Sequence, residues 1–166
     1  MTAQIGEKLS YEGQEVSMCN EPLGDYFAFA GIDPGFEFTC TALWRGYVGT
    51  WEIRNGRLYL IGLTGMLKTG SEANVATFFP DHPDRVFAHW YSGTLRIPQG
   101  KMLEYVHMGY GSTYEEDLMV VIYKGVVTET NVRHNGTSTD PDAADGYGIG
   151  AMTVFPRDRQ SKEGGQ

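Results

Sequence analysis

The stretch HWYSGTLRIPQG, which begins at His89, holds the side chains best suited to chemistry in this chain. On an extended strand His89 and Tyr91 share one face, and imidazole titrates near neutral pH, so the two could move protons. Arg96 could hold an anion, and Glu104 or His107 could act as a base. Together they outline an enzyme or binding barrel for a small polar or anionic ligand. The competing interpretation is a half-buried aromatic strand with solvated polar residues, which is favoured because no partner motif fixes the geometry.

Three groups follow the order found in ADP-ribosyl transferases. An arginine on an early strand (Arg45) comes first, a serine-containing run (Tyr91–Thr94, YSGT) second, and an acid (Glu115 or Asp117) third. In this order the chain resembles that family, although its middle run reads S-G-T where the family has S-T-S. The resemblance implies that an enzyme of this kind would be a transferase of ADP-ribosyl type.

The glycine-rich loop Gly109–Ser112 and the acids that follow it suit the recognition of a protein. Glycine-rich loops cradle phosphate at helix starts, but the flanks here read as strands, with neither a Walker lysine nor a complete GxGxxG. Tyrosine supplies contact area at low entropic cost. We therefore predict a non-enzymatic interaction protein of the immunity, inhibitor or accessory type. Its predicted contact residues are Tyr110, Tyr114, Glu115 and Glu116.

Metal and cofactor signals are weak throughout the chain. The four histidines show no HxH or HExxH spacing. The run from Asp140 to Gly146 lacks the alternation and closing glutamate of a calcium loop. Cys19 and Cys40 form no CxxC pair and read as inert, reduced thiols. The prediction is therefore no metal and no cofactor.

The chain has 166 residues and a formal net charge of −8, which argues against nucleic acid as a partner. A small basic group beside Trp44, made of Arg45, Arg54 and Arg57, is the weak counter-signal. Residues 1–37 hold seven acids against one base, so a partner protein with a basic surface is expected, with a homodimer as a further alternative.

Location is inferred from the start of the chain and from its apolar runs. The first fifteen residues lack a basic start and an apolar run, so no signal peptide is expected. No stretch approaches the ~18–20 apolar residues that span a bilayer. We expect a cytoplasmic protein that uses no membrane. The runs WRGYVGTWEIRNGRLYL and FAHWYSGTLRIPQG resemble segments of uncharacterised bacterial proteins, and this resemblance implies a bacterial or phage-related accessory protein.

The run Thr50–Leu60 predicts a β-hairpin, because Asn-Gly between alternating segments favours a two-residue type I′ turn. The predicted register pairs Arg54 with Arg57, Ile53 with Leu58, Glu52 with Tyr59 and Trp51 with Leu60. The face that carries Trp51, Ile53, Leu58 and Leu60 should belong to the core.

Other short segments rich in β-branched and aromatic residues are expected to be strands. These are Phe38–Trp44, Val86–Ile97 with a bend at Gly93, Met102–Met108, Asp117–Tyr123 and Val126–Val132. Because Pro98 lacks a backbone N–H, the chain is expected to turn at IPQG. Ser71–Phe79 is the candidate helix, with Ser71 or Thr69 as its N-cap.

These elements predict a mainly β fold: an antiparallel sandwich or half-open barrel of about seven to nine strands with one short helix. Residues 1–134 should form the β-rich globular domain. Residues 135–166 are rich in Gly and Asp and should be ordered in part at most, with a candidate edge strand at Ala151–Phe155.

Overall fold

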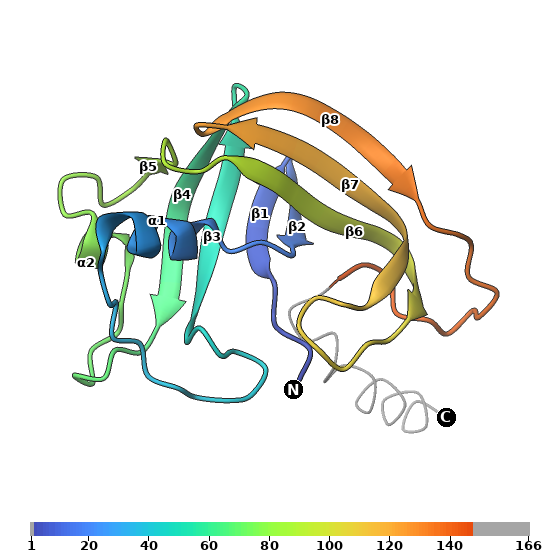
Figure 1. Cartoon of the computed structure of the whole chain (residues 1–166), viewed down its shortest axis with the longest axis horizontal. Coiled ribbons are helices and arrows are strands. Elements are labelled where there is room, and N and C mark those ends of the chain that lie inside the picture. The colour runs from blue at the N-terminus through green and yellow to red at the C-terminus, as the bar shows by residue number, and fades with distance from the viewer. Residues whose placement is uncertain (1, 148–166) are drawn as a thin grey trace.

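The computed structural model describes residues 2–147, and within them the chain forms eight strands and two helices (Figure 1). The strands are β1 (Glu7–Tyr11), β2 (Gln14–Met18), β3 (Tyr47–Arg54), β4 (Arg57–Gly65), β5 (Val86–Phe87), β6 (Gly93–Glu104), β7 (Thr113–Tyr123) and β8 (Val126–His134). The helices are α1 (Pro22–Ala30) and α2 (Val75–Phe78). The predicted mainly β fold is confirmed.

All eight strands belong to one sheet, in the order β2-β1-β3-β4-β8-β7-β6, with β5 paired to β4 outside this path. The pairing is antiparallel except between β1 and β3, which run parallel. The two ends of the sheet approach each other where Cys19, just after β2, donates its N–H to the Arg96 carbonyl of β6 (2.9 Å). Asn20 extends this seam by accepting the Arg96 N–H (2.7 Å) and donating to the Thr94 carbonyl (2.9 Å). The sheet is therefore a half-open barrel.

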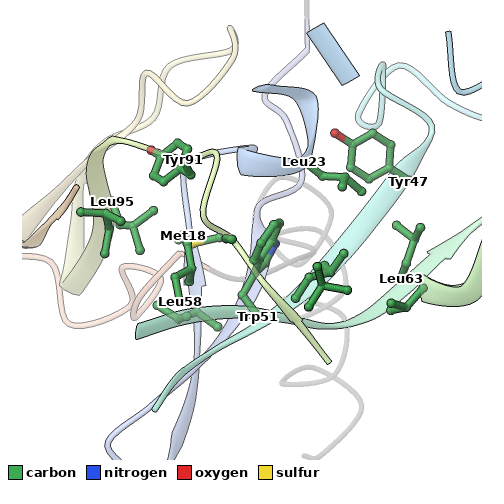
Figure 2. Packing of buried hydrophobic residues seen from close by; sticks show 14 of the residues in the cluster. Met18, Leu23, Tyr47, Trp51, Leu58, Leu63, Tyr91 and Leu95 are labelled. Atoms are coloured by element: carbon green, nitrogen blue, oxygen red, sulfur yellow. The ribbon is translucent and has the colours of Figure 1, made fainter. Parts of the chain in front are cut away.

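The β3–β4 hairpin has the predicted register, with all four expected pairs in place. Asn55 and Gly56 both adopt positive φ, as a type I′ turn requires. Trp51, Leu58 and Leu60 are fully buried, and Figure 2 shows Trp51 among side chains from several strands and from α1. The prediction that this face of the hairpin belongs to the core is confirmed for these three residues.

Pro98 does not turn the chain, so that prediction is wrong. β6 runs straight through it from Gly93 to Glu104, with Pro98 opposite Asp117 of β7. β6 lies at one end of the sheet order, where proline is tolerated because its missing N–H need not face a neighbouring strand. The irregularity comes later, as a register shift between Gln99 and Met102, where Gly100 takes positive φ.

Phe38–Trp44 forms no strand, which corrects a second prediction. The segment lies at the surface, with Phe38 and Trp44 largely exposed, so its apolar residues do not seek the core. Met102–Met108 is strand only as far as Glu104. β7 and β8 confirm the last two predicted strands with slightly longer bounds.

The helix α1 was not expected, because its aromatic residues favour strands. Pro22 occupies the first turn, where its missing N–H costs nothing, and Gly31 closes the helix in a left-handed conformation. Leu23 and Phe27 are buried, so packing of this face against the core decides the helical state. The predicted short helix is confirmed as α2, although its N-cap is Asn74 in a capping box with Thr77.

The chain after β8 folds back onto the sheet as far as Tyr147. Asn135 donates its N–H to Glu115, Met102 donates to Ala144, and Gly146 donates to Gly100 (2.7–2.8 Å). The Tyr147 ring is buried against Met102 and Tyr114. The candidate edge strand at Ala151–Phe155 lies outside the described residues.

Candidate functional site

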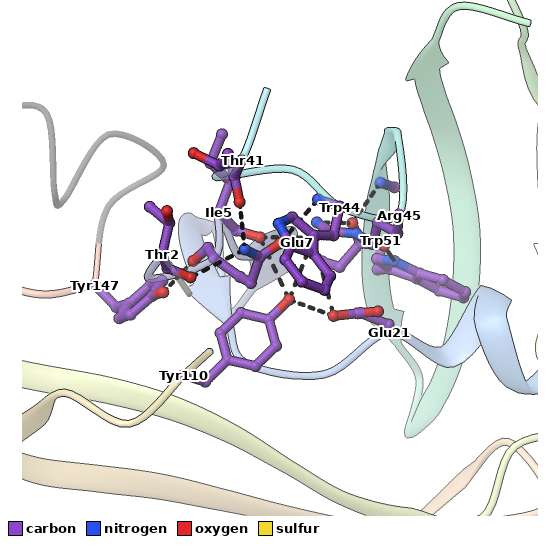
Figure 3. A network of polar contacts seen from close by, with 12 residues as sticks. Thr2, Ile5, Glu7, Glu21, Thr41, Trp44, Arg45, Trp51, Tyr110 and Tyr147 are labelled. Carbon is purple, nitrogen blue, oxygen red and sulfur yellow. Dashed lines mark hydrogen bonds and ion pairs between the residues drawn. The ribbon is translucent and has the colours of Figure 1, made fainter. Parts of the chain in front are cut away.

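A buried charged network lies at the end of the barrel where β1 begins (Figure 3). Glu7 is fully buried and accepts hydrogen bonds from Arg45 Nη2 (2.7 Å), the Gly49 N–H (2.7 Å) and Trp51 Nε1 (3.1 Å). Gly49 fits this place because a Cβ there would lie 2.7 Å from Trp51 Nε1. The carboxylate therefore links β1 to the start and the middle of β3.

The network continues from Arg45 toward the surface. Arg45 Nη1 donates to the Ile5 carbonyl (2.8 Å) and lies 3.3 Å from the Tyr110 hydroxyl. That hydroxyl donates to Glu21 (2.6 Å), a side chain that is only partly covered. The loop that carries Tyr110 is thereby fastened to the start of α1.

Burial and neighbouring charges shift the pKa values in this network. Burial raises the pKa of the Glu7 carboxyl, against the opposing effects of Arg45 and the Gly49 N–H. Burial acts to lower the pKa of Arg45, but Glu7 and Tyr110 outweigh it and raise that pKa. Burial also raises the pKa of Tyr110. Because Glu7 has no contact with solvent, no substrate reaches it, and the network acts as an anchor for the segment that ends at Arg45.

The segment that leads into Arg45 comprises residues 29–44, which we call the aromatic segment. Its C-terminal end is also held by Gln4, whose Oε1 accepts the Trp44 N–H (2.9 Å) and whose Nε2 donates to the Thr41 carbonyl (2.8 Å). Gln4 also accepts a hydrogen bond at its own carbonyl from Tyr147. The N-terminal residues before β1 thus fix the last turn of the aromatic segment.

The middle of the aromatic segment is fixed by Phe36, which is buried among aromatic rings of α1, α2 and β3. Its ring centroid lies 4.8 Å from that of Tyr47, 5.8 Å from that of Phe78 and 6.4 Å from that of Phe27. On either side of Phe36 the backbone is tied to the loop after β4, since Glu37 donates to the Met66 carbonyl (2.7 Å) and Lys68 donates to the Gly35 carbonyl (2.9 Å).

Large apolar side chains stand out from this anchored segment. The exposed fractions are 77% for Phe29, 59% for Phe38, 54% for Trp44 and 39% for Ile32. Long connections without secondary structure are uncommon in compact domains and are often functional. An exposed apolar surface costs free energy in the isolated molecule, and surfaces of this kind commonly mark binding sites.

The charged side chains within the aromatic segment and just before it are all acidic. Residues 20–44 contain four acids and no lysine, arginine or histidine. These acids are Glu21, Asp25, Asp33 and Glu37. Partial burial and then the neighbouring Glu21 raise the pKa of Asp25. The stretch that carries the exposed aromatic side chains therefore has only acidic charges of its own, and the backbone of Lys68 bonds to it at Gly35.

The structure does not bring the five candidate catalytic residues together. His89 and Tyr91 precede β6, whereas Glu104 ends it and His107 follows it. At ~3.3 Å per residue, a strand of 12 residues spans on the order of 35 Å. His107 contacts Tyr105 (2.9 Å), and His89 lies on the surface beside Trp90.

The HWY run serves the packing of α1. Trp90 Nε1 donates to the Pro22 carbonyl (2.8 Å), and the Trp90 ring packs on Tyr26 and stacks on Phe79. Burial raises the pKa of Tyr91 to about 12, so this phenol stays protonated at neutral pH. Within the stretch that begins at His89, Trp90 therefore has a structural role in holding α1.

Arg96 has structural partners on three sides. Its Nε donates to Asp117 (2.9 Å), and its two terminal nitrogens donate to the Tyr110 and Ser112 carbonyls (2.7 and 2.9 Å). Asp117 is buried and also accepts from Arg133 (2.6 Å). Arg96 is therefore committed to joining β6, β7 and the loop before β7.

The four predicted contact residues are divided between the interior and local contacts. Tyr114 is fully buried, so its ring is not available to a partner, and Tyr110 is half-buried within the polar network. Glu115 accepts the N–H groups of Lys101 and Ser138 (2.8 Å each), which lowers its pKa. Glu116 pairs with His134 (2.7 Å) on the surface.

The order that resembles ADP-ribosyl transferases is not matched by proximity. Arg45 lies in the buried network, and Ser92 accepts the Lys124 N–H (2.9 Å) at the β7–β8 turn. Glu115 and Asp117 lie toward the opposite end of β7 from Lys124. Ser92 and the acids are therefore separated along the length of that strand.

Other chemical possibilities find little support in residues 2–147. No group of three or more metal-ligating side chains gathers there. Burial raises the pKa of Cys19 to about 12, so its thiol stays protonated. A surface hollow of about 240 Å³ touches Glu115, Glu116 and His134, and a larger one of about 510 Å³ lies beside Arg54 and His82. None of the helices in this part of the chain is long and apolar enough to cross a membrane.

Sequence reasoning missed the aromatic segment because it assigned Phe38–Trp44 to a strand. The alternation of apolar and polar residues from Phe36 to Thr41 favoured a strand, and the only contrary signal was the turn-forming residues on either side, Asp33-Pro34-Gly35 and Gly46. It also missed Glu7, which looks like any other acid of the N-terminal quarter. No protein-family model, no curated protein and no solved structure matches this chain.

Proposed function

We propose that this protein is a non-enzymatic interaction protein that binds a basic partner protein through the aromatic segment, residues 29–44. The observation that carries the proposal is the exposure of Phe29 at the end of α1, and of Phe38 and Trp44 on the following loop, which is anchored at its middle and at its end. Anchoring matters because a fixed loop loses little conformational entropy when a partner binds.

Charge defines the partner's chemistry. Aromatic side chains supply the apolar core of an interface, and a rim of carboxylates selects basic partners and speeds their encounter. The partner surface should therefore combine an apolar hollow with lysine or arginine around it. The proposal keeps the immunity, inhibitor or accessory class and a cytoplasmic setting, in which the two free thiols would stay reduced.

The test is capture of a partner from an extract of the native host on immobilised full-length protein, compared across three variants. Phe38→Ser and Trp44→Ser each remove one exposed ring of the aromatic segment. Tyr123→Ser is the matched control, because Tyr123 is equally exposed (58%) but lies at the end of β7. Captured proteins are then purified and titrated against each variant.

We expect one partner that binds wild type and Tyr123→Ser alike, and that binds Phe38→Ser and Trp44→Ser at least about tenfold more weakly, as loss of a central aromatic contact does. Its binding should also weaken as salt is added. Equal binding by all four proteins contradicts the proposal. Loss of biological activity in His89→Ala and His107→Ala chains that still fold would instead favour the small-ligand alternative.

A further inference from the structure

The outer edge of β8 is open over most of its length. β7 pairs with β8 from Tyr123–Val126 to Glu116–His134, but β4 meets β8 only at Arg57–Val126. Within residues 2–147 no other strand pairs with β8, and Thr128 through His134 are all exposed. Figure 1 shows β8 arching along the outside of the molecule, away from β4.

The register shows which peptide groups of β8 point outward. Asn135 donates its N–H to the Glu115 carbonyl (2.8 Å), so this opposing pair is hydrogen-bonded. Opposing pairs in an antiparallel ladder alternate, and the β7–β8 register has no shift from Glu116–His134 to Val121–Glu129. Glu129, Asn131 and Arg133 therefore bond to β7, whereas the peptide groups of Thr130 and Val132 face outward.

Pro98 provides an independent check on this alternation. Asp117 lies between Pro98 of β6 and Arg133 of β8. The alternation directs the N–H and C=O groups of Asp117 toward β8, so Asp117 forms no backbone hydrogen bond with Pro98. The N–H that proline lacks is therefore not needed in the β6–β7 pairing, and β6 continues through Pro98. The same alternation directs the Arg96 peptide groups away from β7, where they bond to Cys19 and Asn20.

Within residues 2–147 the edge of β8 lacks several of the usual protections against pairing. Natural edges carry proline, bulges, covering segments or charged side chains, and the charges here, Glu129 and Arg133, are of opposite sign. β6 has Pro98 on its edge and is partly covered by the chain after β2. Between Glu129 and His134, β8 has neither proline nor a register shift. No other strand of residues 2–147 pairs with the outward N–H and C=O groups of Thr130 and Val132, so they can bond to a strand of another chain.

We propose that β8 pairs with β8 of a second copy of this chain, antiparallel, about a two-fold axis at Asn131. The sequence ETNVR at 129–133 supports this because it is complementary to itself when reversed. Glu129 falls opposite Arg133 of the partner subunit, and Thr130 falls opposite Val132 of the partner subunit. A two-fold interface repeats each contact, so both charge pairs are attractive.

The geometry of the ladder suits these pairs. Thr130 and Val132 form the hydrogen-bonded pairs across the new interface, and Glu129 and Arg133 form non-hydrogen-bonded pairs, whose side chains lie closer together. Glu129 forms no ion pair within residues 2–147. Arg133 donates a hydrogen bond from Nη2 to Asp117, but its side chain is 57% exposed. Its other N–H groups can therefore reach Glu129 of the partner subunit.

The dimer is independent of the proposed partner binding. In Figure 1 the aromatic segment begins at α1, on the opposite side of the molecule from the exposed length of β8. A dimer would join the β6-β7-β8 strands of two copies into one continuous sheet and would leave both aromatic segments accessible. Failure of one proposal therefore does not imply failure of the other.

The first test measures self-association of the full chain by sedimentation velocity between about 1 µM and 1 mM, a range that brackets weak and moderate affinities. Glu129→Lys places like charges opposite each other at both pairs and should weaken the dimer at least about tenfold. Glu72→Lys makes the same charge change on an exposed loop and should leave the dimer unchanged.

A mixing experiment tests the register. In a mixed pair of Glu129→Lys and Arg133→Glu chains, both positions are complementary again, whereas each variant alone is repulsive. The mixture should therefore associate more strongly than either variant. Circular dichroism verifies that Arg133→Glu, which also loses its contact with Asp117, remains folded.

Amide hydrogen exchange gives a readout in the wild-type chain that no folding defect affects. Exchange at Thr130 and Val132 should slow as protein concentration rises, whereas Asn131, which faces β7, should be protected at all concentrations. A chain that stays monomeric throughout the range overturns the proposal. So does a dimer that leaves Thr130 and Val132 unprotected, or one that Glu129→Lys and Glu72→Lys affect equally.

Discussion

Glu7 is the residue whose surroundings depart furthest from its appearance in the sequence. It lies on a strand that reads as a half-exposed edge, EKLSY, yet its carboxylate is fully buried with three N–H donors around it. Removing one partner of a buried ion pair costs more than the pair contributes, because the other charge stays buried without compensation.

We predict that Glu7→Gln lowers the free energy of unfolding by about 3 kcal/mol, since Arg45 loses its counter-charge and one amide N–H must face another donor. Urea unfolding followed by circular dichroism measures this change. Glu12→Gln, in the exposed turn between β1 and β2, is the control and should stay within about 0.5 kcal/mol of wild type. Equal stability of the two variants would mean that Glu7 is not a structural anchor.

The elements differ in how far local signals specify them. The β3–β4 hairpin depends on a turn that only Asn-Gly and similar pairs adopt readily, so its register follows from sequence. The helix α1 depends instead on Leu23 and Phe27 finding the core, which no local pattern reveals. Two glycines, one in each element, should therefore respond in opposite directions to the same substitution.

Gly56→Ala should destabilise the protein by about 1–2 kcal/mol, because Gly56 holds φ at +72° in the turn. Gly24→Ala should stabilise it by about 0.5–1 kcal/mol, because alanine favours helix and the nearest atom to the new Cβ, the Tyr47 hydroxyl, would lie 3.6 Å away. Thermal unfolding of both variants measures the two shifts. Shifts of the same sign would contradict these local assignments.

The stability of the whole molecule depends on pH through carboxylates whose pKa differs between the folded and the unfolded state. Asp117 is the buried example, where Arg96, Arg133 and Asn135 meet across β6, β7 and the end of β8. Burial acts to raise the pKa of Asp117, but hydrogen bonds from those three side chains outweigh it and lower the pKa below its ordinary value. Its contribution to stability is therefore complete above the unfolded-state pKa and is lost as the pH falls toward the folded-state pKa.

We predict that Asp117→Asn costs about 2 kcal/mol at pH 7 and that this deficit shrinks as the pH is lowered through about 4. Urea unfolding of wild type and variant at a series of pH values measures the difference. Asp84→Asn, on an exposed loop, should differ from wild type by no more than about 0.5 kcal/mol at each pH. A deficit that stays constant from neutral to acid pH would show that the charge of Asp117 is not what stabilises the three strands.

Sequence alone determined the mainly β class, the β3–β4 register and the short helix before Pro80, because turn chemistry and side-chain alternation act between near neighbours. It also located the acidic N-terminal quarter, since charge is a property of composition.

Only the tertiary structure decided which polar residues are buried and which apolar residues remain outside. Glu7, Arg96 and Asp117 enter the interior because partners from distant segments satisfy them, and those contacts form only when the sheet curls toward itself. Phe38 and Trp44 stay exposed because the backbone next to each is held in place. The Phe36 ring packs into the core just before Phe38, and Gln4 accepts the backbone N–H of Trp44. Burial is a property of long-range contacts, and no window of sequence contains them.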